Sequence, residues 1–192
     1  MWWRRAAANA ALILLILWLA PHHPTWLWER PEGRLFLGLF LLWGAVEWIG
    51  LVVLSRLSSD WGTSPPLARW LDRLLSLVIV AMFTIALRKW EGDGVEPFYR
   101  YLCVALGGAG MGLRWWAMTT LGPRFNQQVA PTGPWVKTGP YWWFRHPAYV
   151  GLIMVLCALM GLLASRIGLL MVAVGVAPLL AMRGYLERRS RL

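Results

Sequence analysis

The sequence predicts an all-α integral membrane protein, a single membrane domain over residues 1–192 with about six transmembrane helices. Hydrophobic residues make up 58% of the chain and charged residues only 15%, whereas about 25% of the residues in a typical soluble domain are charged. A chain of this length cannot bury so much apolar surface, because a folded domain of its size still exposes about 30% of its surface. The excess must face lipid, which excludes an ordinary soluble domain, intrinsic disorder and a disulfide scaffold.

The formal net charge of +10 has a distribution that is typical of membrane proteins. Basic residues are sparse and lie between long apolar runs, which is how Lys and Arg fix orientation in a bilayer, whereas a nucleic-acid-binding domain gathers them into a patch. We therefore expect membrane lipid as a partner, and no nucleic acid. Cys103 and Cys157 lie inside apolar runs and are expected to pack as small core residues, so no metal site is expected.

Three apolar stretches in the N-terminal part, residues 1–98, are candidates for membrane helices, which need ~20 mostly apolar residues. The first covers about 6–20. The segment that follows it has no small-residue cleavage site, so we expect a retained helix rather than a signal peptide. The second covers about 35–54 and is the clearest of all, and the third covers about 74–87.

Three further stretches lie in the C-terminal part, residues 99–192. They cover about 99–121, 148–164 and 167–182. Because only Ser165 and Arg166 separate the last two, these are expected to form a tight antiparallel hairpin. The fourth stretch contains four glycines, which are expected to permit close helix packing; they are Gly107, Gly108, Gly110 and Gly112.

The distribution of Lys and Arg predicts the orientation of these helices. The termini and the loops after the second and fourth helices are richer in them than the loops after the first, third and fifth; the residues concerned are Arg4, Arg5, Arg56, Arg69, Arg73, Arg124, Lys137, Arg145, Arg183, Arg188, Arg189 and Arg191. Because Lys and Arg are enriched on the cytoplasmic side, we place these loops and both termini in the cytoplasm. We prefer the inner membrane of a bacterium to the endoplasmic reticulum.

The loop over about 122–145 stands apart from the others, because it is rich in Gly, Pro and Gln and ends in a Tyr-Trp-Trp-Phe run. Long ordered loops tend to be functional. Pro147 is placed to open the next helix, so His146 stands at a helix N-terminus, which suits a ligand carboxylate or a polarised oxygen. The alternative is an aromatic belt at the membrane interface, with Arg145 and His146 facing lipid headgroups.

The stretch 139–151 reads Gly-Pro-Tyr, three residues, Arg-His-Pro, one residue, Tyr, one residue, Gly. This pattern resembles the signature of the isoprenylcysteine carboxyl methyltransferases and their bacterial relatives. That family also has an Arg with a Glu four residues later, after a hydrophobic hairpin, and Arg183 and Glu187 occupy those places. The resemblance covers about residues 114–187. Phospholipid N-methyltransferases and NADPH-dependent membrane sterol-type reductases share a similar motif.

The resemblance implies an S-adenosylmethionine site that is built from this loop and the last two helices, in a methyltransferase-like core over residues 99–192. The cofactor-binding positions that match are Trp135, Val136, Tyr141, His146, Pro147, Ala148, Tyr149 and Glu187. The catalytic pair would be Arg183 and Glu187. Arg183, with Arg114, would also bind a lipophilic substrate that is prenylated or bears a carboxylate, because arginine is suited to a bidentate carboxylate clamp. The alternative for Arg183 and Glu187 is an ordinary i,i+4 surface ion pair.

Two charged residues lie away from the starts of the predicted membrane helices, Glu47 in the second and Arg114 in the fourth. Burying an ionisable group in the membrane costs free energy, so such groups are usually paired or functional. We therefore expect Glu47 to face the interior of the helix bundle, where it either pairs with an arginine such as Arg114 or lines a lipophilic tunnel. The alternative is an uncharged Glu47 that is satisfied by a backbone carbonyl.

The function that the sequence favours is an integral-membrane methyltransferase that takes S-adenosylmethionine from the cytoplasm and a lipophilic acceptor from the bilayer. The first alternative is an NADPH-dependent sterol-type reductase. Against it, the sequence has no further cluster of basic residues for phosphate beyond Arg145 and the tail. The second alternative is a membrane scaffold without catalytic activity.

Overall fold

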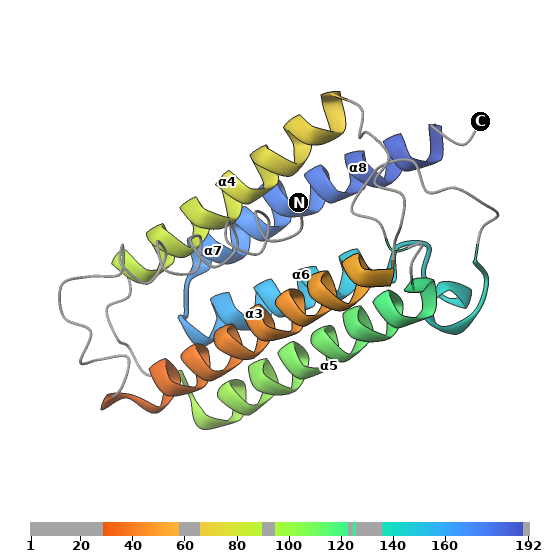
Figure 1. The fold of residues 1–192 in the computed structure, drawn as a ribbon. Coiled ribbons are helices and arrows are strands. Elements are labelled where there is room, and N and C mark those ends of the chain that lie inside the picture. Colours follow the sequence, from red (N-terminus) through yellow and green to blue (C-terminus); the bar gives the residue numbers. More distant parts are fainter. Residues whose placement is uncertain (1–28, 58–65, 90–94, 123–124, 126–135, 190–192) are drawn as a thin grey trace.

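The computed structural model describes residues 29–57, 66–89, 95–122, 125 and 136–189, and all regular structure within these ranges is helical (Figure 1). The elements are α3 (Pro31–Leu57), α4 (Pro66–Arg88), α5 (Pro97–Leu121), the short 3-10 helix η2 (Gly139–Trp142), α6 (Pro147–Leu162), α7 (Arg166–Met171), the π-helical turn η3 (Val172–Val176) and α8 (Ala177–Arg189). The predicted first helix, 6–20, lies outside the described residues. The all-α fold class is confirmed for the described residues.

Proline opens α3, α4, α5 and α6. The first turn of a helix tolerates proline because its missing N–H would have no partner there. Among the helix starts, the largest difference between prediction and structure has this cause. The third helix is predicted over 74–87, whereas α4 begins at Pro66. Arg69, Asp72 and Arg73 therefore lie on a helix and not in the preceding loop.

The last helix is also longer than predicted. The expected end was residue 182, but α7, η3 and α8 run on continuously from Arg166 to Arg189. The apolar run does end near residue 182, but charged side chains do not interrupt a helix whose backbone hydrogen bonds continue. Arg183 and Glu187 consequently lie on α8, one turn apart, rather than in a tail.

The hairpin between α6 and α7 is as tight as predicted. Ala164 adopts a positive φ of 49°, and Ser165 caps α7, its hydroxyl accepting a hydrogen bond from the Gly168 N–H at 3.0 Å. Such a cap satisfies one of the backbone donors that a helix leaves unpaired at its start. The chain therefore reverses direction between Leu162 and Arg166.

Figure 1 shows the helices in two groups: α3, α5 and α6 lie together, and α4 lies along the continuous α7–η3–α8 helix. The chain alternates in direction, so Leu57, Pro66, Leu121, Pro147 and Arg189 all lie at one end of the molecule (Figure 1). We call this end the loop end. It is the end at which the sequence places the basic loops and the C-terminus.

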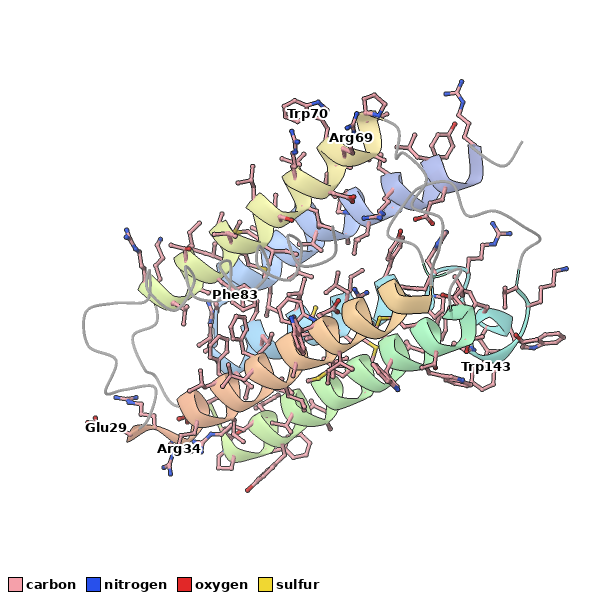
Figure 2. The ribbon with its side chains drawn as sticks, in the orientation of Figure 1. Glu29, Arg34, Arg69, Trp70, Phe83 and Trp143 are labelled. Carbon is pink, nitrogen blue, oxygen red and sulfur yellow. The ribbon has the colours of Figure 1, made fainter. Side chains whose placement is uncertain are left out.

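Aromatic rings connect the two groups of helices. Phe83 of α4 points toward α3 (Figure 2) and is fully buried, with its ring centroid 5.2 Å from that of Phe40. Phe36 and Trp43 of α3 contact the same ring. Ring pairs at this separation add to the stability gained by burial, so this contact anchors α4 on the rest of the bundle.

Glycines allow the close approach of α5 and α6. A Cβ on Gly110 would lie 2.7 Å from the Gly151 carbonyl oxygen, and a Cβ on Gly107 would lie 2.6 Å from a Leu39 methyl carbon. By contrast, a Cβ on Gly108 or Gly112 would meet no atom of the described residues within 4 Å. The expected packing role is therefore confirmed for two of the four glycines and stays a prediction for the other two.

Three helical segments within the described part of the chain are long and apolar enough to cross a membrane: Pro31–Gly50, Pro66–Arg88 and Arg166–Glu187. The apolar helix Pro147–Leu162 is shorter. Large apolar side chains such as Leu42, Leu77 and Leu170 are more than half exposed, which fits a surface that faces lipid. The protein is an integral membrane protein, and the count of six spans stays a prediction.

Candidate active site at the loop end

The start of α6 and the last turns of α8 meet at the loop end. Tyr149 donates its hydroxyl hydrogen to Glu187 Oε1, and His146 Nδ1 lies 3.5 Å from Glu187 Oε2. The rings of His146 and Tyr149 are stacked, with centroids 5.3 Å apart. Three residues that the sequence proposed for the cofactor are thus in mutual contact, although the helices that carry them are separated by the hairpin.

Arg183 joins this group from α8 and links it to α4. Its Nη1 contacts the carboxylate of Asp72, and its Nε lies 3.6 Å from Glu187 Oε1. The side chains of Arg183 and Glu187 are only 13% and 17% exposed. The i,i+4 pair exists, but it is part of a larger interhelical group and is not a solvated surface pair. We call Asp72, His146, Tyr149, Arg183 and Glu187 the polar cluster.

Gly184 provides the space into which the His146 ring fits. A Cβ at Gly184 would lie 3.0 Å from His146 Nε2 and 3.2 Å from Cδ2, which is tighter than ordinary contact. The absence of a side chain therefore lets the imidazole of His146 pack directly on α8. The sequence analysis did not identify Gly184, because its importance depends on a neighbour 38 positions away.

The end of the long loop supports the cluster from the side of α5. At Gly139, φ is +58° and a Cβ would lie 2.9 Å from Thr120 Oγ1, so glycine is needed there. Tyr141 follows, and its hydroxyl lies 3.5 Å from the Ala117 carbonyl oxygen. Burial, and to a smaller extent the Glu187 carboxylate, raises the pKa of the Tyr141 phenol far above its ordinary value, so the phenol stays protonated.

Of the four remaining residues that the sequence predicts for the cofactor, the structure describes three. Pro147 and Ala148 are buried in the first turn of α6, and Val136 is half-buried ahead of η2. Trp135 lies outside the described residues. None of these three described residues contributes a polar side chain, so any contact they make with a ligand is through backbone or apolar surface.

The aromatic residues of the loop divide into two sets. Trp142 and Trp143 are each 74% exposed, and Trp143 projects outward beyond η2 (Figure 2). Tyr141 and His146 are instead partly buried against helices. The two interpretations of this stretch, a ligand site and an aromatic belt, therefore apply to different residues. The tryptophans suit a membrane interface, while Tyr141 and His146 lie toward the interior.

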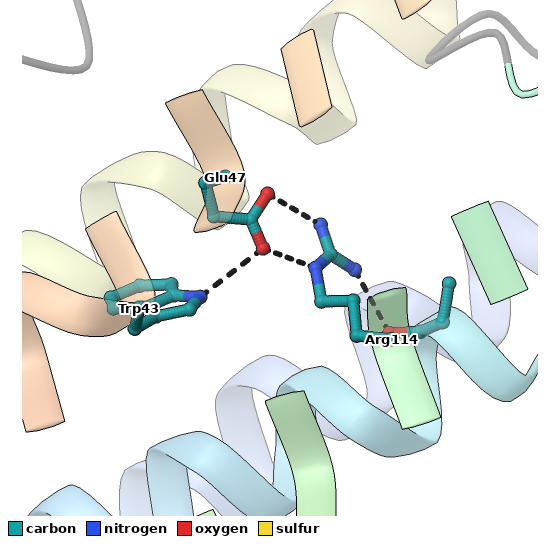
Figure 3. A network of polar contacts seen from close by, with 4 residues as sticks. Trp43, Glu47 and Arg114 are labelled. Atoms are coloured by element: carbon teal, nitrogen blue, oxygen red, sulfur yellow. Dashed lines mark hydrogen bonds and ion pairs between the residues drawn. The ribbon is translucent and has the colours of Figure 1, made fainter. Parts of the chain in front are cut away.

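Arg114 belongs to a separate network of polar contacts with Glu47 and Trp43 (Figure 3). Its Nε and Nη2 donate to the Glu47 carboxylate, the latter at 2.9 Å, and its Nη1 donates to the Ala148 carbonyl oxygen at 2.9 Å. Trp43 Nε1 donates to the same carboxylate at 3.2 Å. The expected pairing of Glu47 with Arg114 is confirmed. All three guanidinium nitrogens already have protein acceptors, so the substrate role expected for Arg114 stays a prediction.

Asp72 is the functional candidate that the sequence analysis missed. It precedes residue 74, where the third helix is expected to begin, so the sequence alone places it in a loop. The run Pro-Leu-Ala-Arg-Trp-Leu-Asp-Arg, with proline at the first helical position, is the signal that could have placed it on a helix. Its partner Arg183 is distant in sequence, so the pairing itself required the fold.

Within the described ranges, no group of three or more His, Cys, Asp or Glu side chains could hold a metal ion. The polar cluster instead offers carboxylates, one guanidinium, an imidazole and a phenol. This donor set suits an organic ligand that carries its own charges.

The fold and the site define an all-helical membrane protein with a polar cluster at one end of the bundle. Residues 103–190 match the model of the Isoprenylcysteine carboxyl methyltransferase (ICMT) family, which confirms the resemblance for this segment and indicates a membrane methyltransferase. The match includes every polar cluster residue except Asp72. No curated protein and no solved structure was found to match the chain.

Proposed function

We propose that this protein is an S-adenosylmethionine-dependent methyltransferase of the membrane that acts on a lipophilic acceptor. The observation that carries the proposal is the meeting of His146 and Tyr149 with Glu187 and Arg183 at the loop end. The two halves of the sequence motif are separated by the α6–α7 hairpin, and the fold returns them to one place. An Arg183–Glu187 ion pair with a structural role alone would not require a histidine, a tyrosine and a glycine around it.

The residues of the cluster fit the charges of S-adenosylmethionine. Glu187 is held by the Tyr149 hydroxyl and lies 3.5 Å from His146, so its carboxylate is positioned to bind an ammonium group. The N-terminus of α6 is adjacent, and a helix N-terminus favours a carboxylate. When bound, the cofactor supplies an electrophilic methyl group on a sulfonium, and the protein contributes mainly by positioning.

The acceptor enters from the lipid in this proposal. Arg183 and its ion-pair partner Asp72 border the place that it reaches, because Arg183 lies on α8 next to Glu187 and both side chains are partly exposed. The loop end is assigned to the cytoplasm, where the cofactor is available, and with it the C-terminus; the N-terminus is assigned to the same side by charge. The apolar surfaces of the helices provide the environment for the acceptor's hydrocarbon.

The proposal predicts that the purified protein binds S-adenosylhomocysteine. Calorimetric titration in detergent with S-adenosylhomocysteine and, separately, with NADPH is the measurement. Binding of the first alone is the expected result. Binding of NADPH alone would replace the proposal by a sterol-type reductase, and binding of neither would favour a membrane scaffold.

Gly184→Ala is expected to lower the affinity for S-adenosylhomocysteine about tenfold while the protein still folds. The new methyl group displaces the His146 ring, whereas replacing glycine by alanine inside a helix generally gains about 1 kcal/mol. His146→Ala gives the full loss of the imidazole for comparison. Titration and thermal unfolding of the same preparations separate the two effects; unchanged affinity in both variants would remove His146 from the site.

A further inference from the structure

The polar cluster places one arginine between two carboxylates from different helices. Asp72 of α4 contacts Arg183 Nη1, and Glu187 of α8 lies 3.6 Å from Arg183 Nε. Asp72 lies outside residues 103–190, so it is not part of the matched family segment. Among the described residues of the cluster, two carboxylates therefore flank one guanidinium.

Asp72 is the outer member of its ion pair. Its side chain is 37% exposed, whereas that of Arg183 is 13% exposed. A molecule that approaches Arg183 from outside therefore meets the Asp72 carboxylate. The guanidinium of Arg183, which the sequence predicts to hold the acceptor's carboxylate, already contacts a carboxylate of the protein itself through Nη1.

This arrangement favours one charge on the acceptor's head group. An ionised carboxylate would have to displace Asp72 or become the third carboxylate around one guanidinium, and like charges in close contact repel. A protonated amine would instead form an ion pair with Asp72 while the Asp72–Arg183 contact persists. Charged side chains of this kind select partners mainly because they repel a partner of the same charge.

We propose that Asp72 is a specificity-determining residue and that the acceptor is an amphiphile with an amine head group rather than an ionised carboxylate. The inference rests on the proposed function and specifies its substrate class. Asp72 binds the ammonium, which releases its proton to water before the transfer. The amine lone pair forms the new N–C bond, and the bond between methyl carbon and sulfonium breaks with its electron pair left on sulfur.

The test compares dodecylamine with dodecanoate, which have the same chain length, at pH 8 in the same detergent. Two quantities are measured for each acceptor: transfer of labelled methyl from S-adenosylmethionine, and the shift in unfolding temperature that the acceptor causes in the presence of S-adenosylhomocysteine. The proteins are the full chain, Asp72→Asn, and Asp72→Glu as the matched variant that keeps the charge.

The full chain and Asp72→Glu are expected to prefer dodecylamine in both measurements. Asp72→Asn is expected to shift the amine-to-carboxylate preference at least tenfold toward dodecanoate, a readout that a merely structural role would not move, because lost structure lowers both acceptors alike. An unchanged preference in Asp72→Asn, or a preference of the full chain for dodecanoate, overturns the inference. Titration with S-adenosylhomocysteine on all three proteins tests the proposed function separately.

Discussion

Replacing Glu47 by glutamine is expected to destabilise the protein by about 3–5 kcal/mol, the usual cost of removing one partner of a buried ion pair. The side chains of Glu47 and Arg114 are only 15% and 12% exposed. Without the carboxylate's charge, the guanidinium of Arg114 is left uncompensated between α3, α5 and α6. A lower midpoint of thermal unfolding and reduced accumulation in membranes would show the effect.

The same prediction includes a rescue. Arg114→Met alone should be destabilising as well, whereas Glu47→Leu combined with Arg114→Met should be more stable than either single variant, because no unpaired charge remains. Glu96→Gln is the matched control, since Glu96 is exposed and its side chain makes no cap hydrogen bond. Destabilisation of the double variant equal to the sum of the singles would show that the two residues act independently.

Insertion of one alanine after Val174 is expected to abolish the binding of S-adenosylhomocysteine. Val174 lies in the π-helical turn η3, which already holds one residue more than an α-helical turn. A further residue that lengthens the helix rotates the part after it by about 100° and shifts it by about 1.5 Å. Arg183, Gly184 and Glu187 would then leave the face that meets α4 and the start of α6.

Val174 is a suitable position because its side chain is 69% exposed, so a change there disturbs little packing. Deletion of Val174 is the matched control: it converts the π-helical turn into an α-helical turn, keeps the following residues on their face and should retain binding. Helical content by circular dichroism and calorimetric titration are measured on both variants. An insertion variant that keeps its helical content and still binds with unchanged affinity would show that the register of α8 does not matter.

Much of the site could be predicted from local sequence. The Arg-His-Pro motif is continuous in the chain, and its proline fixes the start of α6, so the position of His146 at a helix N-terminus follows from backbone chemistry. Arg183 and Glu187 are one helical turn apart, so their shared face also follows. Asp72, Gly184 and the π-helical turn could not be found this way, because each matters only through residues on another helix.

Local sequence patterns alone predict a helical protein of the membrane, because apolar content, helix length and helix-starting prolines are properties of continuous segments. They also predict that Glu47 needs a partner, since the cost of a charge in lipid is independent of topology. The packing of the helices was needed to identify Arg114 as that partner and to bring Asp72 into contact with Arg183. Those contacts depend on the packing of helices that are distant in sequence, and interhelical packing is set by side-chain shape that hydropathy patterns do not encode.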